Sequence, residues 1–379
     1  YLQAQVVHYK PRVSVLDKEL TTVSYHGLIN FLLLLLSATL IRLAIENYMK
    51  YGFLVSIPGT SVSRRDWLAS VAGFLSVSVA FFVALAIEKN AVPSKPNYAN
   101  VSDEALRVGM DADEKRTVLM HLSNLAFVLV APSCITYFAI FQPALGTAVM
   151  MSACIMFLKL LAVGDGSKAG PAHGNARHRI HYLVAYPHNV SLRNFGYFWL
   201  APTLCYQPSY PRISGSISKS FVAKRLSELV ILCITMYVVI QQYAVPTLVG
   251  SVKAIDTRDG FWLSERVLKL SVISAIVWFL GFYALFHAGL NALAEVLRFA
   301  DRAFYLDWWN SVDLAAYWRE WNLPIHYFCK RHIMVPLVSA PLNLPVSAGV
   351  MVTFLFSAVM HELLFGIPTH CLKGTRLLA

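Results

Sequence analysis

Apolar residues recur along the chain in long runs, and polar segments separate most of them. A helix needs about 20 apolar residues to cross the hydrocarbon core of a bilayer. Runs of roughly this length or longer lie at about 28–46, 67–87, 118–142, 143–163, 222–245, 265–295 and 346–367. The chain shows no internal repeat. This pattern predicts an all-α, polytopic membrane protein with about seven transmembrane helices in one bundle.

Four of the apolar segments have a distinctive form. The third and fourth runs abut at Gln142-Pro143, which predicts a tight helical hairpin. The run 265–295 is longer than one crossing, so we expect it to tilt or to continue beyond the membrane. A shorter apolar stretch near 194–204 does not have the length of a crossing, and we expect it to be interfacial or re-entrant.

Composition agrees with a membrane protein. The chain is 57% hydrophobic and 14% charged, and its mean hydropathy is +0.54. A soluble domain carries about 25% charged residues, so an ordinary soluble protein is excluded. We interpret residues 1–379 as a single domain. The chain begins at Tyr1 and stops soon after an apolar run, so we expect it to be truncated at both ends.

The net charge of +11 raises the question of an anionic partner. Lys and Arg lie mainly in the polar segments between apolar runs, which disfavours nucleic acid. Positive loops on the cytosolic side and anionic lipid headgroups explain most of the charge. A polyanionic substrate that carries a nucleotide is the more specific interpretation.

Loop charge also predicts the orientation. If segment 1–27 is cytosolic and the chain crosses seven times, the cytosolic segments hold 19 Lys and Arg and the opposite side holds 7. Positive residues concentrate in cytosolic loops. We therefore expect the N-terminal segment 1–27 to lie in the cytosol.

The pair His361-Glu362 lies inside the last apolar run. Ionisable groups at this depth are costly unless they face a cavity or a partner, so we expect both to be buried in the bundle. A histidine takes and returns a proton near neutral pH, which suits a general base. A histidine hydrogen-bonded between helices is an equal alternative. Phe365 stands where an H-E-x-x-H motif needs its second histidine, and we expect no metal site.

A polar stripe of His287, Asn291 and Glu295 lies within the long run 265–295. A spacing of four residues places all three on one face of a helix. In lipid this face must point into the protein. Interhelical hydrogen bonding is the interpretation we prefer over a catalytic role.

The segment Arg298–His332 is unusually rich in aromatic residues, and Asp, Asn, Arg and His are interleaved with them. A belt of aromatics at the membrane interface explains the Trp and Tyr residues but not the polar ones. Aromatic faces can stack on an adenine ring, while Arg319, Lys330 and Arg331 can hold phosphates. We therefore expect a loop that binds a nucleotide-bearing substrate.

These motifs resemble the membrane-bound O-acyltransferase family, in its sterol and diacylglycerol acyltransferase branch. The stretch Phe304–Asn310 is similar to the F-Y-x-D-W-W-N motif of this branch, and His361 falls where the family places its intramembrane histidine. Within the branch, Trp321–His326 and Gln241-Gln242 resemble the type-one diacylglycerol acyltransferases more than the sterol ones. Leu363 departs from the family, where Tyr or Phe often follows the His-Glu pair.

The resemblance implies a helical bundle with a buried chamber that transfers a fatty acyl group from acyl-CoA to diacylglycerol. His361 would be the general base, and Asn310 would position the thioester or steady oxyanion charge. Glu362 would orient or tune His361, with a structural role as the alternative. The implied substrate-binding residues are Trp308, Trp309, Arg319, Asn322, His326, Lys330 and Arg331. Apart from acyl-CoA as co-substrate, no cofactor is implied.

The resemblance also implies an endoplasmic reticulum membrane and a homo-oligomer, either a dimer or a tetramer. Two alternatives remain at this point. A sterol acceptor would make the product a steryl ester. A proton-coupled transporter would use His361 and Glu362 as a proton relay, but it gives the aromatic segment no role. Family members continue through about two more helices beyond the position of Ala379.

Overall fold

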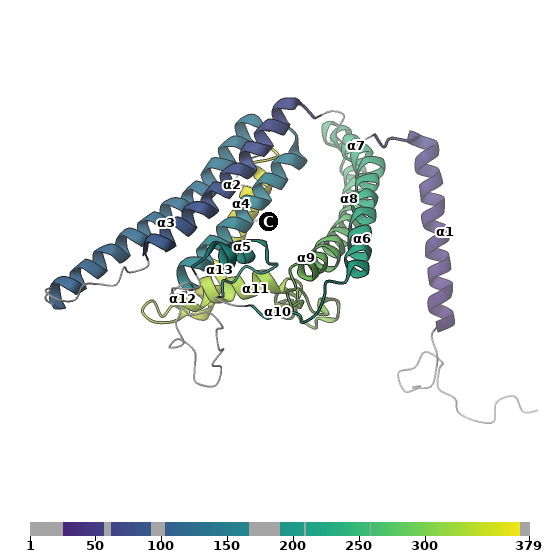
Figure 1. Ribbon diagram of the computed structural model, residues 1–379. Helices are drawn as coiled ribbons and strands as arrows, with labels where there is room; N and C mark the ends of the chain where they lie inside the picture. Colours follow the sequence, from purple (N-terminus) through teal and green to yellow (C-terminus); the bar gives the residue numbers. More distant parts are fainter. Residues whose placement is uncertain are drawn as a thin grey trace, which may run out of the picture. The chain divides into compact units, whose positions relative to one another are not determined.

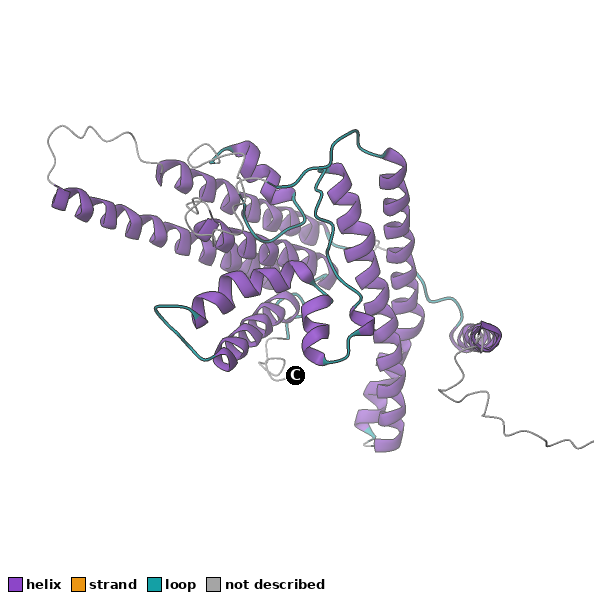
Figure 2. Cartoon of the chain, turned by 90° about the horizontal axis from the view of Figure 1, so that it is seen from below, coloured by secondary structure: helices purple, strands orange, loops and turns teal. Residues whose placement is uncertain are grey.

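The computed structural model describes residues 26–56, 62–91, 103–166, 190–207, 210–257 and 259–371. Within these ranges the chain forms helices joined by loops (Figure 1; Figure 2). The one isolated strand-like pairing in the described part joins Arg212 and Phe299. The all-α prediction is confirmed. The N-terminal segment 1–27 lies outside the described residues apart from His26 and Gly27.

Seven helices among the described residues are long and apolar enough to cross a membrane. They span Ile29–Tyr51, Arg64–Ala91, Lys115–Ala139, Pro143–Val163, Lys219–Asp256, Gly260–Val296 and Val346–Gly366. Each overlaps one of the apolar runs, so the seven predicted crossings are confirmed as helices. Helices suit this environment because lipid offers no hydrogen bonds to the backbone, and a helix satisfies its peptide groups internally.

The chain divides into two compact units, residues 1–56 with 237–277 and residues 57–236 with 278–379. The first unit contains α1 (His26–Tyr51), the π-helix η3 (Ile240–Ala244), α7 (Val245–Asp256) and most of α8 (Gly260–Phe282). At the end of α1, Gly52 has φ +67°, and its N–H donates to the Tyr48 carbonyl at 2.8 Å. Glycine adopts this left-handed cap without strain.

The helix predicted over 222–245 is longer in the structure, because it continues through Pro246. α6 (Lys219–Val239) leads through η3 into α7, which makes one span of 38 residues. Pro246 has no N–H for the carbonyl of Gln242 four residues earlier. The side-chain amide of Asn47 donates to that carbonyl instead, at 3.3 Å. The π-helical turn also widens the helix here, so Pro246 does not end it.

The second unit is built on three long helices that lie side by side (Figure 1). These are α2 (Arg64–Ala91), α3 (Asp103–Ala139) and α4 (Pro143–Gly166). α3 and α4 form the predicted hairpin. Gly73 permits the close approach of α2 to α4, because a Cβ at this position would lie 2.6 Å from Cγ1 of Val149. A larger residue would have to displace a branched side chain, so the sequence fixes this contact with glycine.

A short helix, α5 (Leu192–Leu200), packs against this core. Phe198 is buried, and the ring of Trp199 stacks on Phe81 of α2 with centroids 4.5 Å apart. A helix of this length cannot cross a membrane. The stretch 194–204, expected to be interfacial or re-entrant, is therefore a short helix and a loop that does not span.

The rest of the second unit follows α8 along the chain. Its elements are η4 (Tyr283–Gly289), α9 (Leu290–Val296), η5 (Trp308–Asn310), α10 (Leu314–Glu320), α11 (Leu323–Cys329), η6 (Lys330–Met334), α12 (Val335–Val338), α13 (Val346–His361) and η7 (Glu362–Gly366). The sequence predicts a loop over Arg298–His332, whereas the structure forms short helices over much of it. Side-chain caps start two of them: Asp313 accepts the N–H of Ala316 at 2.6 Å, and Asn322 accepts that of Ile325 at 3.2 Å.

Candidate functional site

An aromatic cluster surrounds the start of η5. The ring of Trp308 meets Trp278, Phe282 and Tyr317 edge to face, with centroids 5.5, 5.2 and 5.8 Å apart. Such edge contacts are the favoured geometry for aromatic pairs. Trp308 is half-buried, and its Nε1 has no hydrogen-bond partner among the described residues, whereas Trp309 is 61% exposed. The cluster therefore fixes Trp308 and leaves Trp309 free to meet a ligand or lipid.

The polar stripe of the long helix anchors the segment that carries the aromatic motif. Nδ1 of His287 lies 2.8 Å from the hydroxyl of Tyr305. Glu295 forms an ion pair with Arg302 and accepts the backbone N–H of Ser218 at 2.7 Å. The predicted hydrogen bonds between helices are not found among the described residues: the partners of His287 and Glu295 lie in connecting segments, and Asn291 donates to the His287 carbonyl of its own helix at 2.9 Å. The stripe thus positions residues 298–310 against the end of the long helix.

Two asparagines of the predicted site have different surroundings. Asn310 is exposed, and its amide donates to the carboxylate of Asp307 at 3.4 Å. The backbone N–H of Asn310 also donates to the Asp307 carbonyl at 2.8 Å, which fixes the 3₁₀ turn. Asn322 is half-buried and caps α11, so its side-chain oxygen already has a structural partner. Of the two, Asn310 is the amide that faces outward.

An open cavity of about 530 Å³ lies beside the aromatic segment. The loop 202–207, the segment 299–304 and the helices α11 and η6 form its walls. Lys330 and Arg331 lie on one side with Tyr327, and both cations are exposed. An aromatic face beside two cations suits a phosphorylated nucleotide. The structure therefore brings two of the predicted phosphate-binding residues to one cavity.

Arg319 and His326 do not line this cavity, but they lie close to its charges. Arg319 is exposed in the last turn of α10. His326 is half-buried, and burial lowers the pKa of its imidazole, as do the positive charges of Lys330 and Arg319. A neutral imidazole at pH 7 follows. His326 is thus placed to hydrogen-bond rather than to add positive charge.

His361 is exposed in the structure, which corrects the expectation that it is buried. Its Nδ1 lies 2.7 Å from the carbonyl oxygen of Ser357, one helical turn earlier. A carbonyl oxygen only accepts, so Nδ1 carries the proton and the lone pair of the neutral ring is on Nε2. Nε2 is then the atom that can act as a base.

The packing of α13 explains why His361 is uncovered. α13 contacts η6 and α12, and Phe354 meets Trp318 edge to face at 5.8 Å. Only Gly349 of this helix is buried. The rest of its surface, which includes His361, is covered little by the residues that the structure describes.

Glu362 does not orient His361 in the structure. Neither of its buried carboxylate oxygens has a hydrogen-bond partner in the described part of the chain. The Ser357 carbonyl holds the imidazole instead. No hydrogen bond or ring contact between described residues joins His361 to Asn310, so the structure does not bring together the two groups expected at the reacting carbonyl.

Sequence reasoning missed the residues that hold the loop 202–207, which forms one cavity wall. The hydroxyl of Tyr210 accepts the N–H of Gln207 at 2.9 Å and donates to the Cys205 carbonyl at 3.1 Å. Lys159 of α4 donates to three carbonyls at the end of α5, where this loop begins. A lysine inside an apolar run was the available signal, because such a charge needs a partner within the protein.

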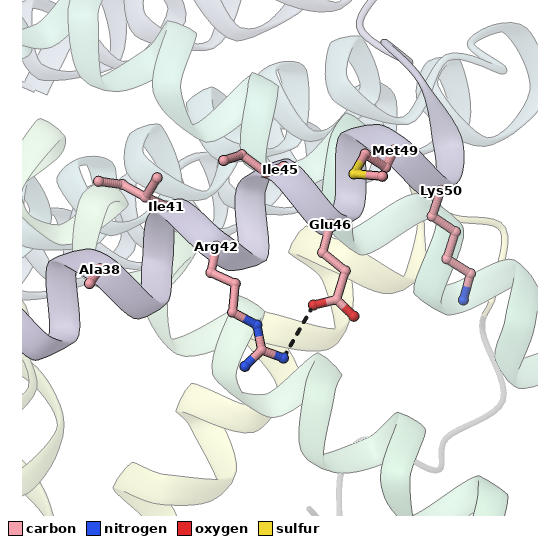
Figure 3. Close-up of a pocket in the computed structure, with 7 residues that line it drawn as sticks. All are labelled: Ala38, Ile41, Arg42, Ile45, Glu46, Met49 and Lys50. Carbon is pink, nitrogen blue, oxygen red and sulfur yellow. Dashed lines mark ion pairs between the residues drawn. The ribbon is translucent and has the colours of Figure 1, made fainter.

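A second hollow and a metal site are the two other possibilities among the described residues. A shallow hollow runs along α1, and all the residues lining it belong to that helix (Figure 3). It contains one ion pair, Arg42 to Glu46, at 3.5 Å. Among the described residues, no three His, Cys, Asp or Glu side chains gather closely enough to hold a metal ion. The cavity lined by Phe304, Lys330 and Arg331 is the candidate site.

Comparison of the sequence with known proteins identifies the family to which the chain is similar. Residues 104–369 match the membrane-bound O-acyltransferase family. Diacylglycerol O-acyltransferase 1 of Arabidopsis thaliana is 35% identical over 98% of this chain and 68% of its own length. The protein of that name in Dictyostelium discoideum is 33% identical, over 96% of this chain and 56% of its own length. The Homo sapiens protein is 33% identical, over 91% of this chain and 70% of its own length.

Proposed function

Because the chain belongs to the membrane-bound O-acyltransferase family, we propose that it transfers a fatty acyl group from acyl-CoA to the hydroxyl of diacylglycerol, which gives triacylglycerol. The observation that carries the proposal is the cavity that places Lys330 and Arg331 beside the aromatic motif. The names of the relatives support diacylglycerol as the acceptor.

The polar head of acyl-CoA enters this cavity in our proposal. Lys330 and Arg331 pair with its phosphates, and the exposed ring of Trp309 is available to stack on the adenine. Arg319 adds positive potential at the entrance, and His326 contributes a hydrogen bond in its neutral form. Two predicted residues act indirectly here, because Trp308 supports Trp309 and Asn322 holds α11 in place.

The proposed chemistry is direct transfer between two substrates. Nε2 of His361 takes the proton of the diacylglycerol hydroxyl as its oxygen attacks the thioester carbonyl. The carbon–sulfur bond then breaks, and His361 returns the proton to the departing thiolate. A thiol has a pKa of about 8.5, so the thiolate leaves readily and no acyl-enzyme is required. Asn310 donates its amide to the oxyanion.

This chemistry requires the diacylglycerol hydroxyl at His361 to reach the thioester carbonyl at Asn310, although no contact joins these two residues in the described part of the chain. An acyl chain in the membrane meets His361 on the uncovered side of α13.

The setting follows from the substrates. Acyl-CoA is water-soluble at its head and reaches the enzyme from the cytosol, while diacylglycerol arrives laterally through the membrane. We infer an endoplasmic reticulum membrane, a cytosolic N-terminus and a homo-oligomer of two or four chains. The transfer uses acyl-CoA as co-substrate and involves no further cofactor.

An acceptor comparison with the full-length protein in microsomes tests the proposal. Radiolabelled oleoyl-CoA is supplied with either diacylglycerol or cholesterol, and the products are separated by thin-layer chromatography. We expect labelled triacylglycerol and only background steryl ester. Labelled steryl ester without triacylglycerol would show that the protein uses a sterol acceptor and belongs to the sterol branch of the family. A protein that binds oleoyl-CoA but esterifies neither acceptor would contradict the proposed reaction.

A further inference from the structure

A buried lysine lies at the junction of α4 and α5. Lys159 is 5% exposed, and its Nζ is 2.7 Å from the Phe198 carbonyl, 2.9 Å from that of Trp199 and 2.7 Å from that of Ala201. Nζ also lies 4.9 Å from the centroid of the Phe198 ring. A primary ammonium has three N–H donors, and here each has one acceptor.

These contacts define what Lys159 can and cannot do. The carbonyls at the end of a helix have no partner within the helix and carry its partial negative charge. The three oxygens at the end of α5 therefore form a small cation site that Lys159 fills. With all three N–H groups engaged with backbone oxygens, Nζ is not free to act as a nucleophile or to bind phosphate.

The same junction begins one wall of the candidate cavity. Ala201 ends α5, and the next residues, Pro202 and Thr203, line the cavity together with Cys205. Beyond them, the Tyr210 hydroxyl holds the far end of the loop through Cys205 and Gln207. The wall is thus fixed at two points, by Lys159 at its start and by Tyr210 at its end.

We propose that Lys159 is a positioning residue that fixes the wall of the acyl-CoA cavity by filling the cation site at the end of α5. This proposal rests on the proposed function only for the identity of the ligand. Without the ammonium, the Phe198 and Trp199 carbonyls lose this donor, and the Ala201 carbonyl keeps only the N–H of Thr203 at 2.8 Å, so the start of the loop 202–207 is no longer tied to α4. Affinity for acyl-CoA then falls, while the base and the acceptor are not directly affected.

Kinetics of the full-length enzyme test the link to the ligand. In Lys159→Met we expect the KM for acyl-CoA to rise roughly tenfold, with less than about a twofold change in kcat or in the KM for diacylglycerol. Lys159→Arg restores a cation and should recover part of the affinity. Lys89→Met removes an exposed lysine of α2 and is the matched control. An equal loss in kcat with unchanged KM values would overturn the proposal.

Thiol labelling tests the anchor without relying on activity. Cys205 lies in the wall, and burial raises the pKa of its thiol, so it should react slowly with N-ethylmaleimide. Peptide mass spectrometry should show faster labelling of Cys205 in Lys159→Met, while the buried Cys154 of α4 stays protected. Unchanged labelling of Cys205 would contradict the proposal that Lys159 holds the cavity wall in place. Labelling of Cys154 as well would show a general loss of fold, which also contradicts a positioning role.

Kinetics and thiol labelling distinguish a failure of the proposed function from a failure of the role of Lys159. If the wild-type protein transfers no acyl group, the proposed function fails, and the labelling result alone still decides whether Lys159 holds the wall. Faster labelling of Cys205 with an unchanged KM for acyl-CoA would contradict the role of this wall in binding.

Discussion

A backbone carbonyl determines which nitrogen of His361 is available. Because the Ser357 oxygen accepts from Nδ1, the lone pair lies on Nε2, on the opposite side of the ring. The helix backbone therefore sets the tautomer and holds the ring, so these tasks do not require Glu362. The neighbouring acid is a poor candidate for this role, since neither of its buried oxygens meets a donor among the described residues.

The proposed role of Asn310 in stabilising the oxyanion can be tested by substitution. Asn310→Ala should lower kcat by roughly 10²-fold or more and change the KM for acyl-CoA little, because the amide acts on charge that develops in the transition state. Steady-state kinetics of the full-length enzyme measure both constants. A rise in KM with an unchanged kcat would instead make Asn310 a binding residue.

His326 offers a prediction on pH. Its folded-state pKa is lowered by burial and by Lys330 and Arg319, so the unfolded chain binds a proton more readily. The neutral form is favoured in the fold, and its stabilising contribution is fully present above the unfolded pKa of about 6.5. Stability should fall as the pH drops from about 6.5 through the folded-state pKa.

Thermal unfolding of the wild type and His326→Gln at pH 7.5 and at a mildly acidic pH measures this effect. The wild type should lose more stability on acidification than the variant does. Equal losses in the two proteins would show that His326 does not contribute.

Single residues also show where sequence reasoning stops. The aromatic motif could be predicted because polar residues are interleaved with its aromatic residues, which a belt at the membrane interface does not explain, and the basic pair Lys330-Arg331 follows in the same segment. Lys159 was not, since its three acceptors lie about 40 positions further along the chain. The exposure of His361 was also missed, because an apolar run gives no information about which helix faces are covered.

At the scale of elements, a side chain of the π-helix η3 links that helix to the end of α1. Gln242 is buried, and its amide donates to Asn47 and to the Gly52 carbonyl, each at 2.8 Å. Its side-chain oxygen accepts the N–H of Leu54 at 3.0 Å. One side chain thus supplies hydrogen-bond partners for two backbone groups of the turn that follows α1.

Replacement of this side chain should loosen α1. Gln242→Leu removes three hydrogen bonds to part-buried groups, each with a net contribution of about 0.5–1.5 kcal/mol, so we expect a clear fall in the melting temperature. Gln241→Leu is the matched control, because no comparable set of bonds involves Gln241 in the described part of the chain. Differential scanning fluorimetry of the two variants is sufficient. Equal melting temperatures would refute the role of Gln242.

Elements differ in how well the sequence predicts them. Seven spans were predictable because an apolar run long enough to cross the bilayer is rare outside membrane helices. α10 and α11 were missed, although Asp313 and Asn322 are common helix caps, because dense aromatic residues suggested an irregular loop. The continuation through Pro246 depends on a hydrogen bond from Asn47, about 200 residues away, and no local pattern reveals it.

At the scale of the whole molecule, loop charge predicts that the N-terminus is cytosolic. Asn100 and Asn189 each begin an N-x-S sequence, and both lie outside the described residues. The predicted orientation places both in the cytosol, where neither is glycosylated. We expect no shift in electrophoretic mobility after glycosidase treatment of the protein expressed in a eukaryotic cell. A shift that is lost in Asn100→Gln or Asn189→Gln would reverse the orientation.

The central claim is that His361 deprotonates the acceptor. The most direct test is acyl transfer by the full-length protein with radiolabelled oleoyl-CoA and diacylglycerol, comparing wild type, His361→Ala and His370→Ala at matched expression. His370 is a second histidine close by in the sequence, beyond the last span. If His361 is the base, His361→Ala should lose at least roughly 10²-fold of the transfer rate while His370→Ala stays near wild type. Near wild-type transfer by His361→Ala would contradict it.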